Sequence, residues 1–287
     1  MSREAHNVVL SLDIGGTKTM VASVSGDTVL EARTVETDPQ QGPGHWIAQA
    51  RELAQDLPGT PTRVAAAVTG RVRDGRWSAL NPATLDIPAE YPLGQRLAEA
   101  FGLPAFAVND AQAAAWAEFR YGAGQGKDMV FLTVSTGIGG GIIADGRLLS
   151  GAHGLAGHFG ITGNETAERF EDRVSGRWMA AQAAVHVGPG ADARLVFAEA
   201  AAGRDWAEAI IERSAERMAR MLANIQLILD PDLQIIGGGI GLAPGYLERI
   251  AARLAHLPPH LRPTLAAARI GPQAGILGAA ALAIPQT

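Results

Sequence analysis

Residues 10–24 read LSLDIGGTKTMVASV, and residues 133–149 read TVSTGIGGGIIADGRLL. Each stretch has a glycine-rich turn between two short apolar runs, a pattern that predicts a strand-turn-strand hairpin. Glycine tolerates positive φ and has no Cβ, so the backbone N–H groups of such a turn can close on phosphate oxygens. Neither turn is a Walker loop or a dinucleotide fingerprint, because both lead from strand to strand. The two stretches together predict a duplicated phosphate-binding hairpin.

One such turn alone is equally compatible with a glycine hairpin that binds no ligand. Two copies in one chain favour the phosphate-binding interpretation, in which a hydroxyl group and a positive charge assist the backbone of the first turn. The candidate phosphate contacts in the two turns are Gly15, Gly16, Thr17, Lys18, Thr136, Gly137, Gly139 and Gly140.

The composition excludes several classes of protein and of site. The chain has 287 residues, 47% of them hydrophobic, which is enough for two folded domains. Its formal net charge of -5 and the lack of a Lys/Arg cluster argue against a nucleic-acid partner. No apolar run approaches the roughly 18 residues of a membrane span, and residues 1–7 are polar, so we expect no membrane contact and a cytoplasmic location. The absence of cysteine excludes disulfides and thiolate metal sites.

Strand-rich hairpins alternate with helical stretches, which favours an α/β fold. We expect a first domain over residues 1–120, a second over 121–273, and a C-terminal helix, 274–287, that packs back on the first domain. Beyond the two hairpins, we predict helices at 46–57, 93–101, 111–120, 205–229 and 274–283, and strands at 63–69, 106–108 and 234–236.

The predicted strand 106–108 delivers Asn109 and Asp110 to its C-terminal end, where ligands collect in open α/β sheets. A carboxylate there is a candidate general base, so Asp110 is the candidate catalytic residue. The alternative interpretation is structural: Asn109 followed three residues later by Gln112 also fits a helix N-cap with a capping box.

Four motifs resemble those of a known family. DIGGTK (13–18) and STGIGGG (135–141) resemble the two phosphate motifs of sugar kinases with the actin-like, duplicated ribonuclease H fold, and NDAQAAAWAEF (109–119) and GLAGHFG (154–160) narrow the resemblance to the ROK family. Within it the motifs are most similar to those of bacterial N-acetylmannosamine kinases. The resemblance implies a two-domain fold with a central cleft, ATP and Mg²⁺ as cofactors, a small-molecule sugar as substrate, and a homodimer.

The resemblance also assigns roles to single residues. It implies that Asp13 lies near the magnesium ion, and that Gly238 and Gly239 contact the adenosine. The implied sugar contacts are Gly70, Arg71, Asn81, Asn109, Asp110, His158 and Glu171. Each of three residues also has a purely structural interpretation. Asp13 can cap a turn, a lone histidine such as His158 is more often structural, and Glu171 can be a surface charge on a helix.

The chain departs from the family in one loop. Most ROK kinases hold a structural zinc ion with one histidine and three cysteines of a CxCGxxGC loop, but here Ile161 stands at the histidine position and residues 163–170 read GNETAERF. All four ligands are missing, so we expect no zinc. We expect polar contacts among Glu165, Arg169, Glu171 and Arg173 to order this loop instead.

The expected activity is ATP-dependent phosphorylation of the 6-hydroxyl of N-acetylmannosamine, with Asp110 taking the proton, in sialic acid breakdown. The alternatives are a kinase for glucose, fructose or another hexosamine, and a non-catalytic sugar sensor or repressor. ROK repressors carry a DNA-binding segment ahead of the first glycine motif, and only twelve residues precede Asp13 here. We therefore expect no DNA binding.

Overall fold

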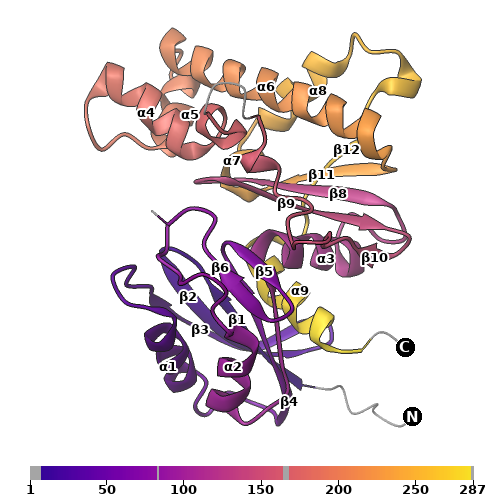
Figure 1. Ribbon diagram of the computed structural model, residues 1–287. Coiled ribbons are helices and arrows are strands. Elements are labelled where there is room, and N and C mark those ends of the chain that lie inside the picture. Colours follow the sequence, from indigo (N-terminus) through magenta and orange to yellow (C-terminus); the bar gives the residue numbers. More distant parts are fainter. Residues whose placement is uncertain (1–7, 83, 164–167, 286–287) are drawn as a thin grey trace. The chain divides into compact units, whose positions relative to one another are not determined.

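The computed structural model describes residues 8–82, 84–163 and 168–285. Contacts divide the chain into two compact units, each of which holds one five-stranded sheet (Figure 1). The first unit comprises Met1–Tyr121, Ser150–Ala156 and Pro272–Thr287, and the second comprises Gly122–Leu149 and Gly157–Gly271. Among the described residues, none of the helices combines the length and hydrophobicity that a membrane-spanning segment requires.

The sheet of the first unit has the strand order β3-β2-β1-β4-β7. Its strands are β1 (Val8–Ile14), β2 (Lys18–Ser25), β3 (Thr28–Glu36), β4 (Pro61–Val68) and β7 (Ala105–Asn109). β2 pairs antiparallel with both β1 and β3, whereas β4 runs parallel to β1 and β7 parallel to β4. The first predicted hairpin is thus confirmed. β3 is absent from the sequence-based prediction because TVLEARTVE has no continuous apolar run and more than half of its side chains are exposed.

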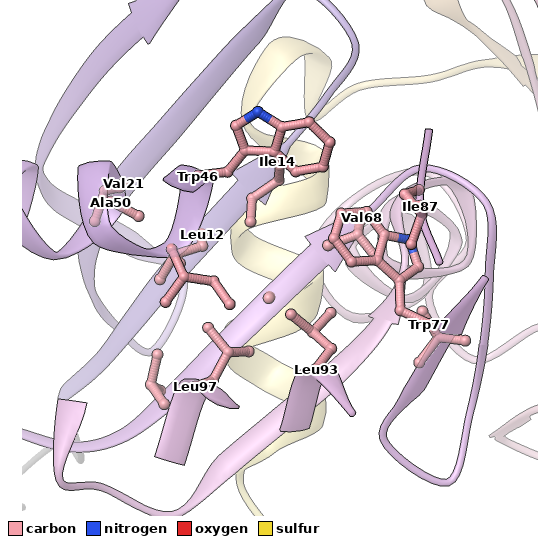
Figure 2. Close-up of a cluster of buried hydrophobic side chains, with 14 of the residues drawn as sticks. Leu12, Ile14, Val21, Trp46, Ala50, Val68, Trp77, Ile87, Leu93 and Leu97 are labelled. Carbon is pink, nitrogen blue, oxygen red and sulfur yellow. The ribbon is translucent and has the colours of Figure 1, made fainter. Parts of the chain in front are cut away.

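Helices cover both faces of this sheet. The alternation of β1 sends Leu12 and Ile14 into a core that they share with Trp46 of α1 (Pro43–Leu53) and Leu97 of α2 (Leu93–Phe101), as Figure 2 shows. The rings of Trp46 and Trp77 meet edge to face in this core, with centroids 5.9 Å apart. The small hairpin of β5 (Arg71–Arg73) and β6 (Arg76–Ser78) contributes Trp77.

The opposite face of the sheet carries α3 (Asp110–Tyr121) and α9 (Ala274–Ala283). Ser11, which alternates with Leu12 on β1, donates from its Oγ to the backbone O of Ile276 in α9 at 2.7 Å. α3 and α9 approach each other so closely that a Cβ atom on Gly278 would lie 1.7 Å from O of Ala113. Only glycine fits at this crossing, and the two backbones are in direct contact.

The second unit repeats the strand plan of the first. Its order is β10-β9-β8-β11-β12, with β9 antiparallel to β8 and β10, β11 parallel to β8, and β12 parallel to β11. The strands are β8 (Met129–Val134), β9 (Ile138–Ala144), β10 (Arg147–Leu148), β11 (Leu233–Gly237) and β12 (Leu265–Ala267). The second predicted hairpin and the duplication of the fold are confirmed.

In the second unit, most of the described helices pack around one long helix. This helix, α6 (Asp205–Leu229), has the predicted bounds and contacts α4, α5 and α8. The helices of the second unit are α4 (Gly176–Val187), α5 (Ala193–Ala201), α6, α7 (Gly238–Gly241) and α8 (Tyr246–Leu254), with 3-10 turns at Phe159–Ile161, Phe170–Arg173 and Pro259–Leu261. A further 3-10 turn, Gly271–Gln273, precedes α9.

One segment departs from the expected division into domains. Residues 150–156 were expected in the second domain, but they cluster with the first unit. Nε2 of Gln112 in α3 donates to O of Ala156 at 2.9 Å, and Gly154 packs against β5, where a Cβ atom would lie 2.4 Å from O of Val72. Contacts between residues far apart in the sequence therefore fix this segment to the first unit.

Candidate functional site

Asp110 lies where β7 ends and α3 begins. Its neighbour Asn109 is buried, and Oδ1 of Asn109 accepts hydrogen bonds from the backbone N–H groups of Ala111 and Gln112, both at 3.0 Å. Nδ2 of Asn109 donates to O of Gly70 and to Oδ1 of Asp110, both at 2.9 Å. A side-chain amide offers two donor hydrogens and two acceptor lone pairs. Asn109 therefore caps α3 and orients Asp110, and these four bonds use the full capacity of its amide.

The helix-cap interpretation of Asn109 is thus compatible with a catalytic role for Asp110. Oδ1 of Asp110 also accepts a hydrogen bond from the N–H of Ala111 at 2.7 Å. The expected capping box is only half formed, because the side chain of Gln112 is turned to Ala156. A bond from Asn109 to a sugar hydroxyl would require one of its four present bonds to break.

The first glycine turn joins β1 to β2, and one of its backbone N–H groups forms a hydrogen bond within the turn. The N–H of Gly15 donates to O of Lys18 at 3.1 Å, so this N–H closes the turn and does not face a ligand. Glycine at position 16 leaves room for Thr84, since a Cβ atom there would lie 2.7 Å from Cγ2 of Thr84 and the Thr84 side chain would have to shift. Thr17 and Lys18 are exposed. An anion at this turn would therefore meet the residues from Gly16 onward.

Asp13 lies at the end of β1, just before this turn. Its half-buried side chain packs against the first turn of α9, and its pKa is raised from 3.8 to about 7, mainly because of burial. The negative charge of Asp110 contributes to this rise, and the positive charge of Lys18 opposes it. The first unit thus brings the three charged residues that the sequence singled out within electrostatic range of one another.

Two of the residues predicted to contact the sugar, Gly70 and Arg71, lie beside Ser78. Gly70 has a φ of +91°, and a Cβ atom on it would lie 2.6 Å from O of Ser78. The guanidinium group of Arg71 forms an ion pair with Glu90 and donates to Oγ of Ser78 at 3.3 Å and to O of His153 at 3.4 Å.

Asn81 lies on the loop whose Thr84 covers Gly16, and its O accepts the N–H of Thr84 at 2.9 Å. No local pattern indicates Glu90 or His153, which contact Arg71 only in the folded chain.

The second glycine turn supports the N-terminus of α4. O of Ser135 accepts the N–H of Gly176 at 2.7 Å, and O of Thr136 accepts the N–H of Arg177 at 3.2 Å. Within the turn, the N–H of Ser135 donates to O of Gly137 at 3.0 Å. Thr136 itself is exposed.

Glu171 is buried against this second turn. Its Oε2 accepts the N–H of Ile138 at 3.3 Å, and its Oε1 forms an ion pair with Arg177 at 3.1 Å. A Cβ atom on Gly137 would lie 2.8 Å from Oε2 of Glu171, which explains the glycine. The alternative of a surface helix charge is therefore wrong for Glu171. The Glu171 carboxylate is held against the second glycine turn, a candidate phosphate contact. The expected contact of Glu171 with a sugar stays a prediction.

Two candidate nucleotide contacts lie within β9, where packing bears on their glycines. A Cβ atom on Gly140 would lie 2.6 Å from O of Phe131 and 2.8 Å from the ring of Phe159, so the fold itself requires glycine there. Gly139 pairs with Thr133 in the same strand register. His158 is half-buried and directly precedes the 3-10 turn that begins at Phe159. Packing thus requires glycine at position 140, a constraint that the sequence alone did not indicate.

Gly238 and Gly239 begin α7, which follows β11 directly. Gly238 has a φ of +83°, and a Cβ atom there would lie 2.4 Å from O of Val134. Gly239 differs, because no atom beyond its chain neighbours and the backbone of its own helix lies within 4 Å of the position of its Cβ, and its φ lies outside the left-handed region. The described residues give no steric reason for glycine at position 239, and its expected contact with the adenosine stays a prediction.

Polar contacts order the described part of the loop at the family's zinc position. N of Arg169 donates to Oδ2 of Asp172 at 3.0 Å, and Nε of Arg173 pairs with Glu168 at 2.6 Å. Arg169 lies 3.9 Å from Glu171. Glu168 and Asp172 were missed, although both stand beside residues that were named, and Glu165 lies outside the described residues.

No group of three or more His, Asp or Glu side chains that could hold a metal is present among the described residues. Structural zinc sites usually have four cysteine or histidine ligands, and the described residues of this loop, 161–163 and 168–173, include neither. The expectation of no structural zinc stays a prediction.

A family model described as "ROK family" matches residues 9–286. The chain belongs to the ROK family. An N-acetylmannosamine kinase of Citrobacter koseri is 43% identical to this ROK protein over 284 residues, which cover 96% of this chain and 98% of the relative. A bifunctional enzyme NanE/NanK of Brucella melitensis is 47% identical over 278 residues, covering 96% of this chain and 54% of the relative. The chain thus spans about half the length of the bifunctional relatives it matches.

A solved structure shares the fold of this ROK protein. The ROK family glucokinase from Streptomyces griseus, in complex with glucose and AMPPNP, matches with a TM-score of 0.82 at 27% identity, over 96% of this chain and 99% of that chain. The fold is therefore the actin-like fold of ROK sugar kinases, with the duplicated sheet that the two hairpins predict.

Proposed function

We propose that this ROK protein is an ATP-dependent kinase that transfers a phosphoryl group to the 6-hydroxyl of N-acetylmannosamine. The observation that carries the proposal is the 43% identity to an N-acetylmannosamine kinase over 98% of that relative's length. The oriented carboxylate of Asp110 supports it, because phosphoryl transfer needs a group that accepts the hydroxyl proton. A cytoplasmic location and a homodimer stay predictions, which cell fractionation and light scattering would test.

The proposed reaction needs one proton acceptor. Asp110 takes the proton of the 6-hydroxyl while the new bond forms between that oxygen and the γ-phosphorus, and the bond from the γ-phosphorus to the leaving oxygen of ADP breaks. Asn109 holds Oδ1 of Asp110 through its Nδ2, and the N–H of Ala111 donates to the same oxygen. These two donors fix the direction of the carboxylate, so a hydroxyl proton meets an oriented acceptor.

The proposed phosphate contacts are the two glycine turns. In the first, the residues after Gly15 offer backbone N–H groups, the hydroxyl of Thr17 and the ammonium of Lys18. In the second, Thr136 is exposed and Gly137 is held against Glu171. The open space over Gly239 supports its role as an adenosine contact.

Magnesium fits the residues of the first unit. The Asp13 carboxylate, a hard oxygen ligand, makes no hydrogen bond or ion pair with the described residues. Magnesium prefers oxygen ligands and usually keeps several waters, so one carboxylate beside the phosphates is enough. When bound with ATP, the ion neutralises charge on the phosphate oxygens.

A kinase for a different hexose is the second candidate, because the structural match is to a glucokinase bound to glucose. A coupled ADP-release assay with N-acetylmannosamine, glucose, fructose and other hexosamines tests the choice. We expect the highest kcat/KM with N-acetylmannosamine. A higher kcat/KM with any other sugar would reject this substrate.

A non-catalytic sugar sensor is the remaining alternative, and the Asp110→Asn variant separates it from a kinase. This change keeps the size of the side chain and removes the proton acceptor. We expect loss of nearly all turnover with sugar binding retained in calorimetry. Turnover equal to that of the wild type would show that Asp110 is not the base.

A further inference from the structure

The carboxylate of Asp13 faces the start of α9, within the first unit. Asp13 alternates with Leu12 on β1 and therefore points to the same face of the sheet as Ser11. The bond from Oγ of Ser11 to O of Ile276 fixes this part of α9 against β1 at 2.7 Å. The position of the helix backbone beside Asp13 is thus set by a buried hydrogen bond.

Gly275 of α9 lies beside Asp13. A Cβ atom on Gly275 would lie 2.9 Å from Oδ2 and 3.4 Å from Cγ of Asp13, and 3.6 Å from Cβ of Ala67. The φ of Gly275 lies outside the left-handed region, so conformation does not require glycine. Glycine is also a poor residue inside a helix. Space for the Asp13 carboxylate is the one requirement that the contacts show.

Hydrogen bonds do not explain where the carboxylate of Asp13 lies. Within the described residues, it makes no hydrogen bond and no ion pair. Its position therefore depends on the atoms packed around it, and the bare backbone of α9 at Gly275 forms one wall of that space.

We propose that Gly275 is a positioning residue, which lets the Asp13 carboxylate sit against α9 and so sets its place beside the first glycine turn. The inference rests on the proposed kinase function for its catalytic consequence. A methyl group at 275 pushes the carboxylate away from α9, because atoms closer than 3.0 Å must shift. The phosphate side of the reaction is then affected, and the sugar side is not.

The Gly275→Ala variant tests the catalytic consequence. Displacement of a reacting or binding group by about 1 Å can cost on the order of 100-fold in rate. We expect kcat/KM for ATP to fall roughly 10- to 100-fold, while KM for the sugar stays within about twofold. The matched control is Ala279→Gly, a change of one methyl group at a buried position about one turn further along the same helix. We expect this control to lower Tm and to leave KM for ATP unchanged.

A double-mutant cycle tests the contact without relying on activity. Gly275→Ala is introduced into the wild type and into Asp13→Ala, and Tm is measured for all four proteins. With Asp13 truncated, the new methyl group has space and alanine favours the helix, so Tm should rise. In the wild type, the same change should lower Tm or leave it constant.

The outcomes separate this proposal from the proposed function. Equal Tm shifts in the two backgrounds would show that Gly275 and Asp13 do not interact and would overturn the inference. Unequal shifts with an unchanged kcat/KM for ATP would overturn the positioning role. If the wild type phosphorylates no sugar, the kinase proposal fails. The Tm cycle and the affinity for ATP with Mg²⁺ in calorimetry then decide the role of Gly275.

Discussion

Replacing Asn109 separates two roles that its amide has in the structure. Oδ1 caps α3 through the N–H groups of Ala111 and Gln112, and Nδ2 orients Asp110 while also binding O of Gly70. Asn109→Ala removes all four bonds. Asn109→Ser keeps an oxygen that can cap the helix, but the serine side chain is too short to replace both bonds from Nδ2.

The number of bonds lost sets the expected size of each effect. Loss of the N-cap costs about 1 kcal/mol, and loss of the buried bond to Gly70 costs about 1 kcal/mol more. The bond to the charged Asp110 adds about 1.5 kcal/mol. We therefore expect Asn109→Ala to lower the free energy of unfolding by about 3 to 4 kcal/mol, and Asn109→Ser by about 1 kcal/mol less.

Activity should follow the orienting bonds and not the stability. Both variants lose the donor to Asp110, so we expect similar falls in kcat, of roughly 10- to 100-fold. Equilibrium unfolding in urea measures stability, and the coupled ADP-release assay gives kcat and both KM values. A serine variant with the kcat of the wild type would refute the orienting role. A higher KM for the sugar at unchanged kcat would instead show that Asn109 contacts the sugar, as the family resemblance implied.

Three further changes have distinct expected results. Burial and the Asp110 charge raise the pKa of Asp13 from 3.8 to about 7, so ionising Asp13 opposes folding, and its contribution to stability falls between about pH 4 and pH 7. At about 1.36 kcal/mol per pKa unit, the effect is at most about 4 kcal/mol. The Asp13→Asn variant should therefore be more stable than the wild type at pH 8, in the absence of magnesium and nucleotide. Equal urea midpoints for the two proteins at pH 8 would contradict this. Gly239→Ala should keep the Tm of the wild type and raise KM for ATP. Gly238→Ala should instead lower Tm by several degrees, because its Cβ would meet O of Val134. An unchanged KM for ATP in Gly239→Ala would show that Gly239 is not part of the adenosine site. Treatment with a zinc chelator in the presence of excess magnesium should leave kcat and Tm unchanged, because the bonds of Arg169 and Arg173 order the described part of the loop; a loss of activity that zinc restores would show a metal site.

Local patterns were enough to predict most of the elements that position the candidate site. The apolar runs on both sides of Gly15 and Gly16 predict the first hairpin, and the apolar stripe of residues 205–229 predicts α6 with its observed bounds. Asn109 and Asp110 were expected at the end of a strand, where β7 delivers them. In each case the signal lies within a few residues of the feature, so periodicity and turn residues are sufficient.

The features that the sequence did not reveal depend on contacts between distant residues. Nothing near Gly140 indicates that Phe159 will pack over it, and nothing near Arg71 indicates Glu90 as its partner. Gly275 has the appearance of a small residue in a small-residue helix until Asp13 is seen beside it. Such roles follow from the packing of strands and helices, which one sequence without its fold does not specify.

The contact of Gly278 with Ala113 has a consequence for how the chain folds during synthesis. α3 lies in the first half of the chain, but α9, against which it packs, is translated after the whole of the second unit. On the ribosome, all the strands of the second sheet emerge while α3 still has one side exposed to water. The first unit to be translated is thus the last to complete its core, and until then the newly made chain offers an apolar surface to chaperones.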